Sequence, residues 1–167
     1  MSAAEPPWLM PEGLRLARHL LHSHALVFGV PLLAGIDPAR EPRRAAQELF
    51  AADLVVIAHD EAADPRLIYA NRSALRLWRR NWAAMVGMPS RLTAEASQRA
   101  ARAEALALAR TRQALQGYGG IRVDSRGRRF RIENARLWRV VDAAGGVCGQ
   151  AAAFGRWWWL SGQPQRG

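Results

Sequence analysis

The first quarter of the chain carries apolar residues at helical spacing. Between Glu12 and Phe28 they recur every three or four positions, at Leu14, Ala17, Leu21, Ala25 and Phe28. Basic and polar residues fall toward the other side, so the segment is predicted to be an amphipathic helix. A second, shorter helix is expected from Pro42 to about Phe50, because proline is tolerated in a first turn. Residues 1–11 are expected to form a loose tail, and residues 12–50 a helical extension.

The pattern then changes to that of strands. Leu54 to Ala58 is a short β-branched run, and Leu67 to Ala70 is predicted to return beside it as a second strand. Asn71 follows directly, where its side chain can accept hydrogen bonds from the free amides of a helix that begins there. We therefore expect Asn71→Ala to cost about 1 kcal/mol and Asn71→Asp much less. The predicted helix has an aromatic stripe at Leu75, Trp78, Trp82 and Met85.

An alanine-rich segment from Thr93 to about Gln116 is predicted to be one long helix. Its core-facing stripe is expected at Ala101, Ala105, Leu108 and Leu115.

The last third of the chain consists of strands and turns. One strand contains Ile121 and Val123 on one face, the next runs from Phe130 to Val141, and the last runs from Val147 to about Leu160. With the two earlier strands, this order predicts an α+β domain. It has a five-stranded antiparallel sheet with helices on one face, plus the N-terminal helical extension. Residues 51–161 are predicted to be the domain core, and residues 162–167 a C-terminal tail.

Three consecutive tryptophans, Trp157 to Trp159, close the last predicted strand. Successive strand residues alternate between the faces of a sheet, so the three side chains cannot all enter one core. At least one must be exposed to solvent, covered by a helix or placed at an interface. Trp157 and Trp159 are the candidates for an interface of a homodimer, and cover by the N-terminal helix is the equal alternative.

The net charge of +10 raises the question of a nucleic-acid partner. All 24 basic residues are arginine, they are scattered from Arg15 to Arg166, and no nucleic-acid recognition motif accompanies them. The charge therefore indicates a compositional bias, and a nucleic-acid partner is not expected.

The apolar segments are too short to place the chain in a membrane. The longest, Ala25 to Ile36, covers about a dozen residues and is broken by Pro31, whereas a spanning helix needs roughly 20. No export signal is recognisable at the N-terminus. The single cysteine, Cys148, fits a reducing compartment, so the cytoplasm is the expected location.

Several segments resemble known families. Residues 69–75 (YANRSAL) resemble the passage from strand to helix in PAS domains, where an asparagine caps the helix. Residues 88–95, 119–128 and 133–138, with 148–152, resemble the MEKHLA family of PAS-related domains. The similarity covers roughly residues 14–160. It implies a sensory or protein-interaction role, without an established reaction and without a ligand shared by the family.

Haem and flavin are both disfavoured as cofactors. Haem-binding PAS domains commonly use a histidine on the long helix before the last strands, yet no histidine follows His59. Flavin photoreceptors of this fold need a reactive cysteine at the start of a helix. Cys148 instead falls in a predicted strand, where a buried, unreactive thiol is expected.

No catalytic or metal-binding constellation is recognisable. Ser73, Ser90 and Ser125 lack a nucleophile elbow, and His59 with Asp60 is typical of a turn. His19, His22 and His24 are spaced along the first helix so that they do not converge on one metal ion, which leaves them as surface or core-edge residues. We expect no enzyme and no metal site.

Two hypotheses for function remain. In the first, a cavity between the sheet and the helices binds a small apolar or aromatic ligand, and the domain acts as a non-enzymatic sensor. The candidate lining residues are Ile57, Trp78, Met85, Leu108, Ile121, Phe130 and Trp138. In the second, the core is filled and the domain is a dimerisation or protein-interaction module. The sequence leaves both open, because a packed core and a ligand cavity use the same residue types.

Overall fold

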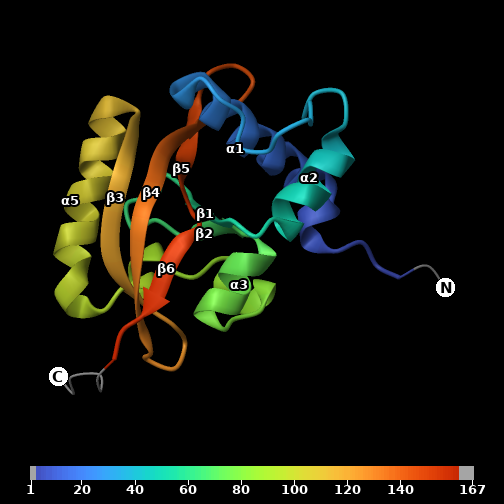
Figure 1. Cartoon of the computed structure of the whole chain (residues 1–167). Helices are drawn as coiled ribbons and strands as arrows, with labels where there is room; N and C mark the ends of the chain where they lie inside the picture. Colours follow the sequence, from blue (N-terminus) through green and yellow to red (C-terminus); the bar gives the residue numbers. More distant parts are fainter. Residues whose placement is uncertain (1–2, 162–167) are drawn as a thin grey trace.

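An antiparallel sheet lies at the centre of the structure, a computed structural model that describes residues 3–161 (Figure 1). Its strands are β1 (Val55–His59), β2 (Leu67–Ala70), β3 (Ala114–Val123), β4 (Arg129–Val141), β5 (Val147–Phe154) and β6 (Arg156–Trp159). The strand order is β2-β1-β5-β4-β3, and all neighbouring pairs are antiparallel. The predicted α+β fold is confirmed.

The last predicted strand is divided at Gly155. β5 pairs with the second half of β4, and β6 pairs with the first half of β4. The two segments therefore run beside β4 as one interrupted strand, which is why five predicted strands become six.

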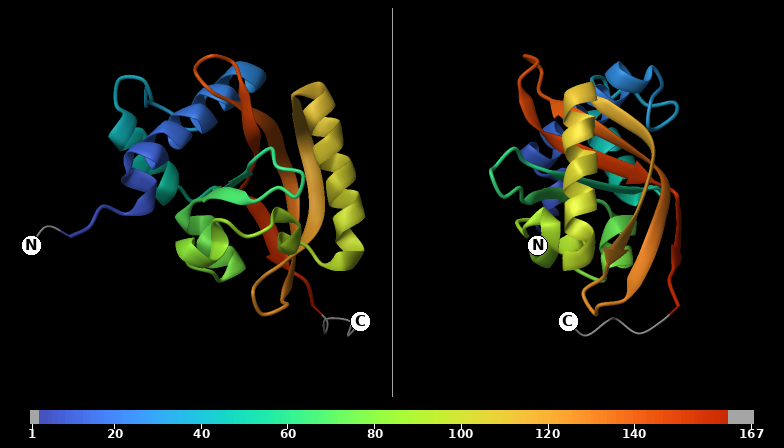
Figure 2. Two further views of the ribbon diagram at one scale, coloured as in Figure 1. Left: turned by 180° about the vertical axis from the view of Figure 1, so that it is seen from behind. Right: turned by 90° about the vertical axis from the view of Figure 1, so that its left-hand side faces the viewer.

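Helices cover both faces of the sheet. They are α1 (Pro11–Phe28), α2 (Pro42–Ala51), α3 (Arg72–Trp78), α4 (Trp82–Met85) and α5 (Ala96–Arg112), with 3₁₀ turns at Pro7–Leu9 and Ser90–Thr93. α5 lies on one side of the sheet, whereas α1 lies on the other side, against β4 (Figures 1 and 2). We call the side beneath α3 and α5 the inner face, and the side beneath α1 the outer face.

Two predicted helices end earlier than expected. The helix after Asn71 stops at Trp78 because Arg79 adopts a left-handed conformation with φ of 56°, and Asn81 then caps the separate helix α4. α5 stops at Arg112 because Gln113 is left-handed, with φ of 67°, and β3 begins at Ala114. Leu115 is consequently a strand residue.

Asn71 joins three elements and does more than cap a helix. Its Oδ1 accepts hydrogen bonds from the amides of Ala74 (3.1 Å) and Val56 (3.0 Å). Its Nδ2 donates to the carbonyls of Leu49 (3.2 Å) and Leu54 (2.7 Å). The predicted cap is present, and the same fully buried side chain also holds the end of α2 and the start of β1 beside α3.

A bulge in β4 reverses the alternation of its side chains. Ile132 pairs with Gly120 but Ala135 pairs with Tyr118, so β4 holds one extra residue there, and Asn134 is left-handed with φ of 55°. Phe130 and Ile132 point to the inner face before the bulge. After it, Trp138 lies on the outer face.

The N-terminal segment is not the loose tail that was expected. Trp8 stacks on Phe50 with ring centroids 3.6 Å apart, Leu9 is buried, and Glu5 forms an ion pair with Arg43 at 2.9 Å. These contacts attach residues from Glu5 onward to α2. The predicted C-terminal tail, 162–167, lies outside the described residues.

Candidate functional site

A small cavity lies between the inner face of the sheet and α5. It has a volume of about 30 Å³ and a recess that opens toward solvent. One part of its wall is apolar and is formed by residues from β1, β2, α3, α5, β4 and β5: Ile57, Leu67, Trp78, Leu106, Ile132, Leu137 and Phe154. The other part is polar and is formed by His59, Arg102, Tyr118, Arg122 and Gln150. This polar wall is the candidate functional site.

Two residues of the polar wall, His59 and Gln150, belong to a row of three residues on adjacent strands, whose third member, Arg139, lies beyond the cavity lining. Arg139 of β4 pairs with Gln150 of β5, and Gln150 pairs with His59 of β1. Each of the three has a buried polar atom without a hydrogen-bond partner: Nε of Arg139, Oε1 of Gln150 and Nε2 of His59. Buried polar atoms are almost always paired in folded proteins, so three neighbouring exceptions point to a missing partner.

His59 presents a hydrogen-bond acceptor to the cavity. Its Nδ1 lies 2.8 Å from the carbonyl oxygen of Asp60, so this nitrogen carries the proton and donates. Burial lowers the pKa of His59, and nearby Arg102 lowers it further, so the ring is neutral. Nε2 therefore carries a free lone pair.

Gln150 presents a second acceptor. Its Nε2 donates to the carbonyl of Leu106 in α5 at 3.0 Å, which leaves Oε1 without a donor. The side chain is 1% exposed, so water at the surface cannot reach it freely.

Arg102 and Arg122 bring two guanidinium groups to the same wall. Arg122 donates to the carbonyl of Ile121 (2.9 Å) and to the hydroxyl of Tyr118 (2.8 Å). Within residues 3–161, the Arg102 side chain has no hydrogen bond, and neither arginine forms an ion pair with a carboxylate. Burying two cations without a counter-ion lowers the stability of the folded chain, because the lost hydration of the charges is not compensated.

Two of the seven predicted lining residues, Ile57 and Trp78, line this cavity. Phe130 and Met85 belong to the same apolar cluster but lie away from the cavity wall. The Phe130 ring packs edge-on against Trp78 with centroids 5.2 Å apart.

The other three predicted lining residues do not line this cavity. Leu108 is 40% exposed, because α5 turns Arg102, Leu106 and Ala109 toward the sheet instead. Ile121 alternates with Arg122 and so lies on the outer face. Trp138 is also on the outer face, where its Nε1 donates to the carbonyl of Leu20 in α1 at 3.3 Å.

The sequence offered only a weak signal for the residues that form the polar wall. Gln150 is a polar residue within an otherwise small and apolar strand, which could have been noticed. Arg102 is one of many arginines on a helix that has no strong apolar stripe, so nothing distinguished it. The sequence around His59 is typical of a turn, but His59 is the last residue of β1 and 5% exposed.

The three tryptophans of β6 alternate as predicted. Trp157 and Trp159 face inward, with ring centroids 6.0 and 5.7 Å from Phe130. Arg128 lies over the Trp159 ring at 3.9 Å. Trp158 points the other way and is 44% exposed, so it is the member of the run that reaches solvent.

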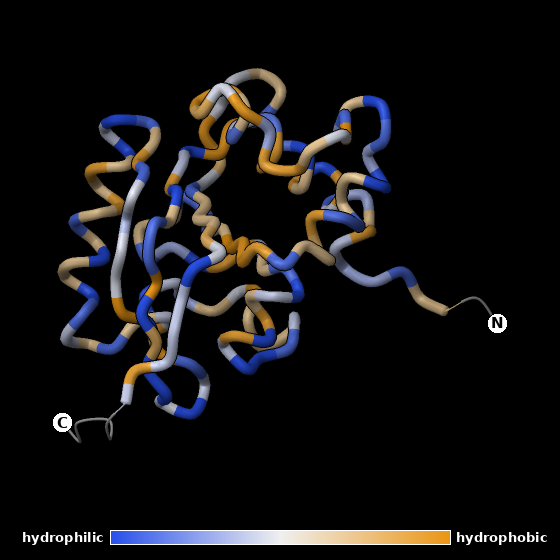
Figure 3. The backbone as a smooth tube through the Cα atoms, viewed as in Figure 1, coloured by the Kyte–Doolittle hydropathy of each residue, from blue (hydrophilic) through white to orange (hydrophobic). Residues whose placement is uncertain are grey.

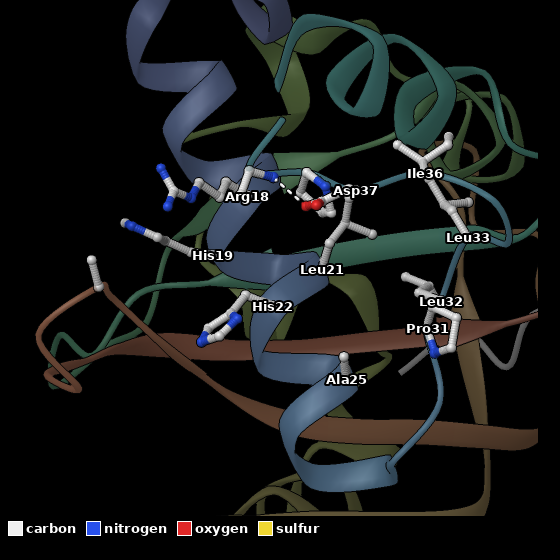
Figure 4. Close-up of a pocket in the computed structure, with 13 residues that line it drawn as sticks. Arg18, His19, Leu21, His22, Ala25, Pro31, Leu32, Leu33, Ile36 and Asp37 are labelled. Atoms are coloured by element: carbon white, nitrogen blue, oxygen red, sulfur yellow. Dashed lines mark hydrogen bonds between the residues drawn. The ribbon is translucent and has the colours of Figure 1, made fainter. Parts of the chain in front are cut away.

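A second hollow lies at the surface between α1 and the loop that precedes α2 (Figure 4). It has a volume of about 390 Å³, and His19 and His22 are among its lining residues. His24 points away from it into the core, where Nδ1 donates to the carbonyl of Val30 (3.1 Å) and Nε2 accepts from Arg136 (3.1 Å). Within residues 3–161, no group of three metal-ligating side chains is close enough to hold an ion.

Cys148 lies on β5, is partly buried, and packs against the apolar residues of the outer face. Its thiol donates to the carbonyl of Val140 at 3.4 Å, and burial raises its pKa. The predicted thiol is therefore half-buried and protonated, and it lies on the side of the sheet away from the cavity.

None of the helices in the described part of the chain combines the length and apolar character that crossing a bilayer requires.

Comparisons with known proteins agree with this architecture. Residues 14–159 match the family model of the MEKHLA domain. A search of the curated proteins gives no match.

Solved structures with the same fold include an RNA-binding light-oxygen-voltage receptor, with 23% identity and a TM-score of 0.62 over 75% of this chain. That match spans 35% of the receptor. The PAS domain of a protein from Colwellia psychrerythraea has 12% identity and a TM-score of 0.59, covering 66% of this chain and 92% of that one. A light-oxygen-voltage domain studied with a flavin analogue has 14% identity and a TM-score of 0.56, covering 73% and 88%.

Proposed function

Because the chain belongs to the MEKHLA-domain family and has the fold of PAS domains, we propose that it is a non-enzymatic sensory domain. In this proposal a small ligand enters the cavity between the inner face and α5. The observation that carries the proposal is the polar wall, where buried atoms of His59 and Gln150 lack partners. A ligand that contacts this wall supplies those partners.

The apolar part of the wall supports the same proposal. Ligand sites commonly combine apolar lining with a few polar groups that set orientation, and Ile57, Leu67 and Trp78 line the same cavity as His59 and Arg102. An apolar or aromatic ligand, as expected from the sequence, matches only the apolar part of the wall and leaves the polar part without partners.

α5 is the element suited to report binding. Only Arg102 and Ala109 of its 17 residues are buried, and in Figure 3 the helix alternates hydrophilic and weakly hydrophobic segments along its length. Few buried contacts hold it, and weakly held elements are the ones that move when a ligand binds. An occupant that touches Arg102 or Leu106 ties this helix to the sheet.

Flavin and haem do not fit this cavity. Its volume of about 30 Å³ is far below the roughly 300–1,000 Å³ of sites for larger ligands. Cys148, the one thiol in the sequence, lies on the outer side of the sheet.

Native mass spectrometry of the purified full chain tests the proposal. We expect a mass excess that is lost on denaturation and absent from Ala152→Leu, which fills the cavity from β5. Ala107→Leu, at an exposed position of α5, is the matched control and should retain the excess. If neither wild type nor Ala152→Leu shows a mass in excess of its sequence mass and no added compound stabilises either, the chain is not a sensor of this kind.

A homodimer that uses the outer face is the second candidate. Trp158 pairs with Arg131, and Arg131 pairs with Ile121, so one row of the outer face carries an exposed indole and an aliphatic side chain on the two sides of Arg131. Tryptophan is enriched at the centres of interfaces. The interface residue favoured here is Trp158, in place of the inward-facing Trp157 and Trp159.

Sedimentation equilibrium at moderate salt tests the dimer. Trp158→Ser is expected to weaken association with little effect on folding, whereas Trp157→Ser should lower stability because it removes packing against Phe130. A wild-type chain that stays monomeric at high micromolar concentration contradicts the dimer and leaves the sensor proposal intact.

A further inference from the structure

The cavity has an excess of positive charge. Arg102 is 9% exposed and Arg122 is 6% exposed. Within residues 3–161, no carboxylate forms an ion pair with either side chain. Burial lowers the pKa of Arg102 to about 10, and the positive charge of Arg122 adds to the effect. Even so, Arg102 remains charged at neutral pH. A buried cation normally has an anionic partner, so this wall lacks one.

The same wall also has an excess of hydrogen-bond acceptors. Nε2 of His59 and Oε1 of Gln150 have no donor, and both belong to residues that line the cavity beside Arg102. An anion without protons satisfies the arginines but not these two atoms. A ligand that completes the wall must therefore combine a negative charge with an O–H or N–H group.

The cavity limits the size of such a ligand. A volume of about 30 Å³ corresponds to about one or two water molecules. This holds an anion of a few atoms, and a slightly larger one if α5 moves outward.

We propose that the cavity binds a small oxyanion that also carries a hydroxyl or amino group. The oxyanion lies between Arg102 and Arg122, and its donor points to His59 and Gln150. The proposal rests on the sensory function proposed above and specifies the chemistry of its ligand. Hydroxycarboxylates and hydrogen phosphate share this chemistry.

Thermal unfolding of the full chain with matched small probes tests the chemistry. The probes are glycolate, acetate without the hydroxyl, neutral glycolamide and inorganic phosphate, with sodium chloride used to hold the ionic strength constant. Glycolate is expected to raise the unfolding midpoint by about 5 °C or more at a hundredfold excess over its Kd. Acetate should have a smaller effect and glycolamide none. A larger shift with phosphate than with glycolate identifies the oxyanion as phosphate.

Arg102→Met and Arg110→Met form a matched pair on α5. Arg102→Met removes the buried charge, and Arg110→Met removes an exposed one. Without a probe, Arg102→Met should unfold at or above the wild-type midpoint, because an uncompensated buried charge is gone. It should no longer respond to glycolate or phosphate, whereas Arg110→Met should respond as wild type does. An unchanged response in Arg102→Met overturns the proposal.

Two measurements on the wild-type chain keep the outcome decisive if Arg102→Met does not fold. The NMR signal of the Arg102 Nε–H is expected to shift on titration with the effective anion, and no shift in this signal contradicts the proposal. Stabilisation by glycolamide equal to that by glycolate overturns the anion proposal while the sensory function stands. If no probe binds and native mass spectrometry finds no ligand, the sensory function fails as well.

Discussion

The two faces of the sheet are covered by helices that are attached in different ways. On the outer face, α1 is joined to β4 by paired polar groups: Trp138 donates to Leu20, and the Ser23 hydroxyl both accepts from the amide of Val141 (2.8 Å) and lies 3.3 Å from its carbonyl. On the inner face, the Arg102 side chain of α5 has no hydrogen-bond partner within residues 3–161, and the Gln150 side chain of β5 donates to the carbonyl of Leu106 in α5 at 3.0 Å.

This difference suggests different roles for the two helices: α1 stabilises the fold, whereas α5 is the helix whose attachment a ligand can change. The apolar side chains of α1 are buried against the apolar residues of the outer face, so α1 completes the core on that side of the sheet. α5 buries few residues and leaves polar atoms of the sheet unpaired beneath it. A helix that leaves unpaired groups beneath it gains stability when a ligand pairs them, whereas a fully paired helix gains nothing.

Matched leucine substitutions on the two helices should show the largest contrast. Leu20→Ala in α1 removes a fully buried side chain and should lower the free energy of unfolding by about 2–5 kcal/mol. Leu108→Ala in α5 should change it by about 0.5 kcal/mol or less, because this side chain is 40% exposed. Urea unfolding followed by circular dichroism measures both. Equal losses would mean that α5 is attached as firmly as α1.

Asn71 shows that the inner helices are not all weakly attached. Asn71→Ala leaves several buried backbone groups without partners and should cost about 2–4 kcal/mol, more than a helix cap alone. Asn71→Asp should cost at least as much, because it replaces the Nδ2 donor with an oxygen that faces the carbonyls of Leu49 and Leu54. This reverses the expectation from the sequence. Denaturant unfolding of both variants measures the order, and a mild aspartate variant would reduce Asn71 to a cap.

His24 makes the outer face sensitive to acid. Burial and the charge of Arg136 lower the pKa of His24 below its usual value of 6.5. At neutral pH the ring is uncharged in both the folded and the unfolded chain. As the pH falls below about 6.5, only the unfolded chain takes up the proton, so stability decreases, by at most about 1.4 kcal/mol per pH unit for one group.

The pH dependence is measured as the free energy of unfolding at pH 7.5 and pH 5.5. His59 and His19 also have lowered pKa values and contribute in the same direction. His24→Gln should therefore reduce the slope without removing it. An unchanged slope would show that the pKa of His24 is the same in the folded and the unfolded chain.

Cys148 gives the smallest expected effect. Its raised pKa and partial burial should make it react slowly with a thiol reagent in the native chain and rapidly after unfolding. Labelling rates followed by absorbance measure this directly. Rapid labelling of the folded chain would show that the region around β5 opens often.

Local patterns were sufficient for most of the fold. The β-branched run of β1, the turn residues between the last strands and the asparagine before α3 predicted the elements and their order, because each depends on residues close in sequence. The alternation of Trp157, Trp158 and Trp159 followed from strand geometry alone.

The side of the sheet on which a residue lies was determined only by the tertiary structure. The parity of β4 predicts Trp138 beside Phe130, but the bulge at Asn134 moves it to the opposite face. β4 is also covered on both faces, so its residues show no alternation that would have revealed the shift.

The rotation of α5 was likewise decided by packing. Alanines occur around the whole helix, so its sequence favours no single face, and Leu108 was as plausible a core residue as Leu106. Arginine is normally exposed, and nothing near Arg102 in the sequence indicates otherwise. Its burial beside Arg122 requires β3, which lies beside α5 only after the chain has folded. The sequence by itself therefore determined the strands and helices and their order along the chain, because these depend on local patterns. The charged cavity was decided only by the tertiary structure, because it brings together residues from separate elements.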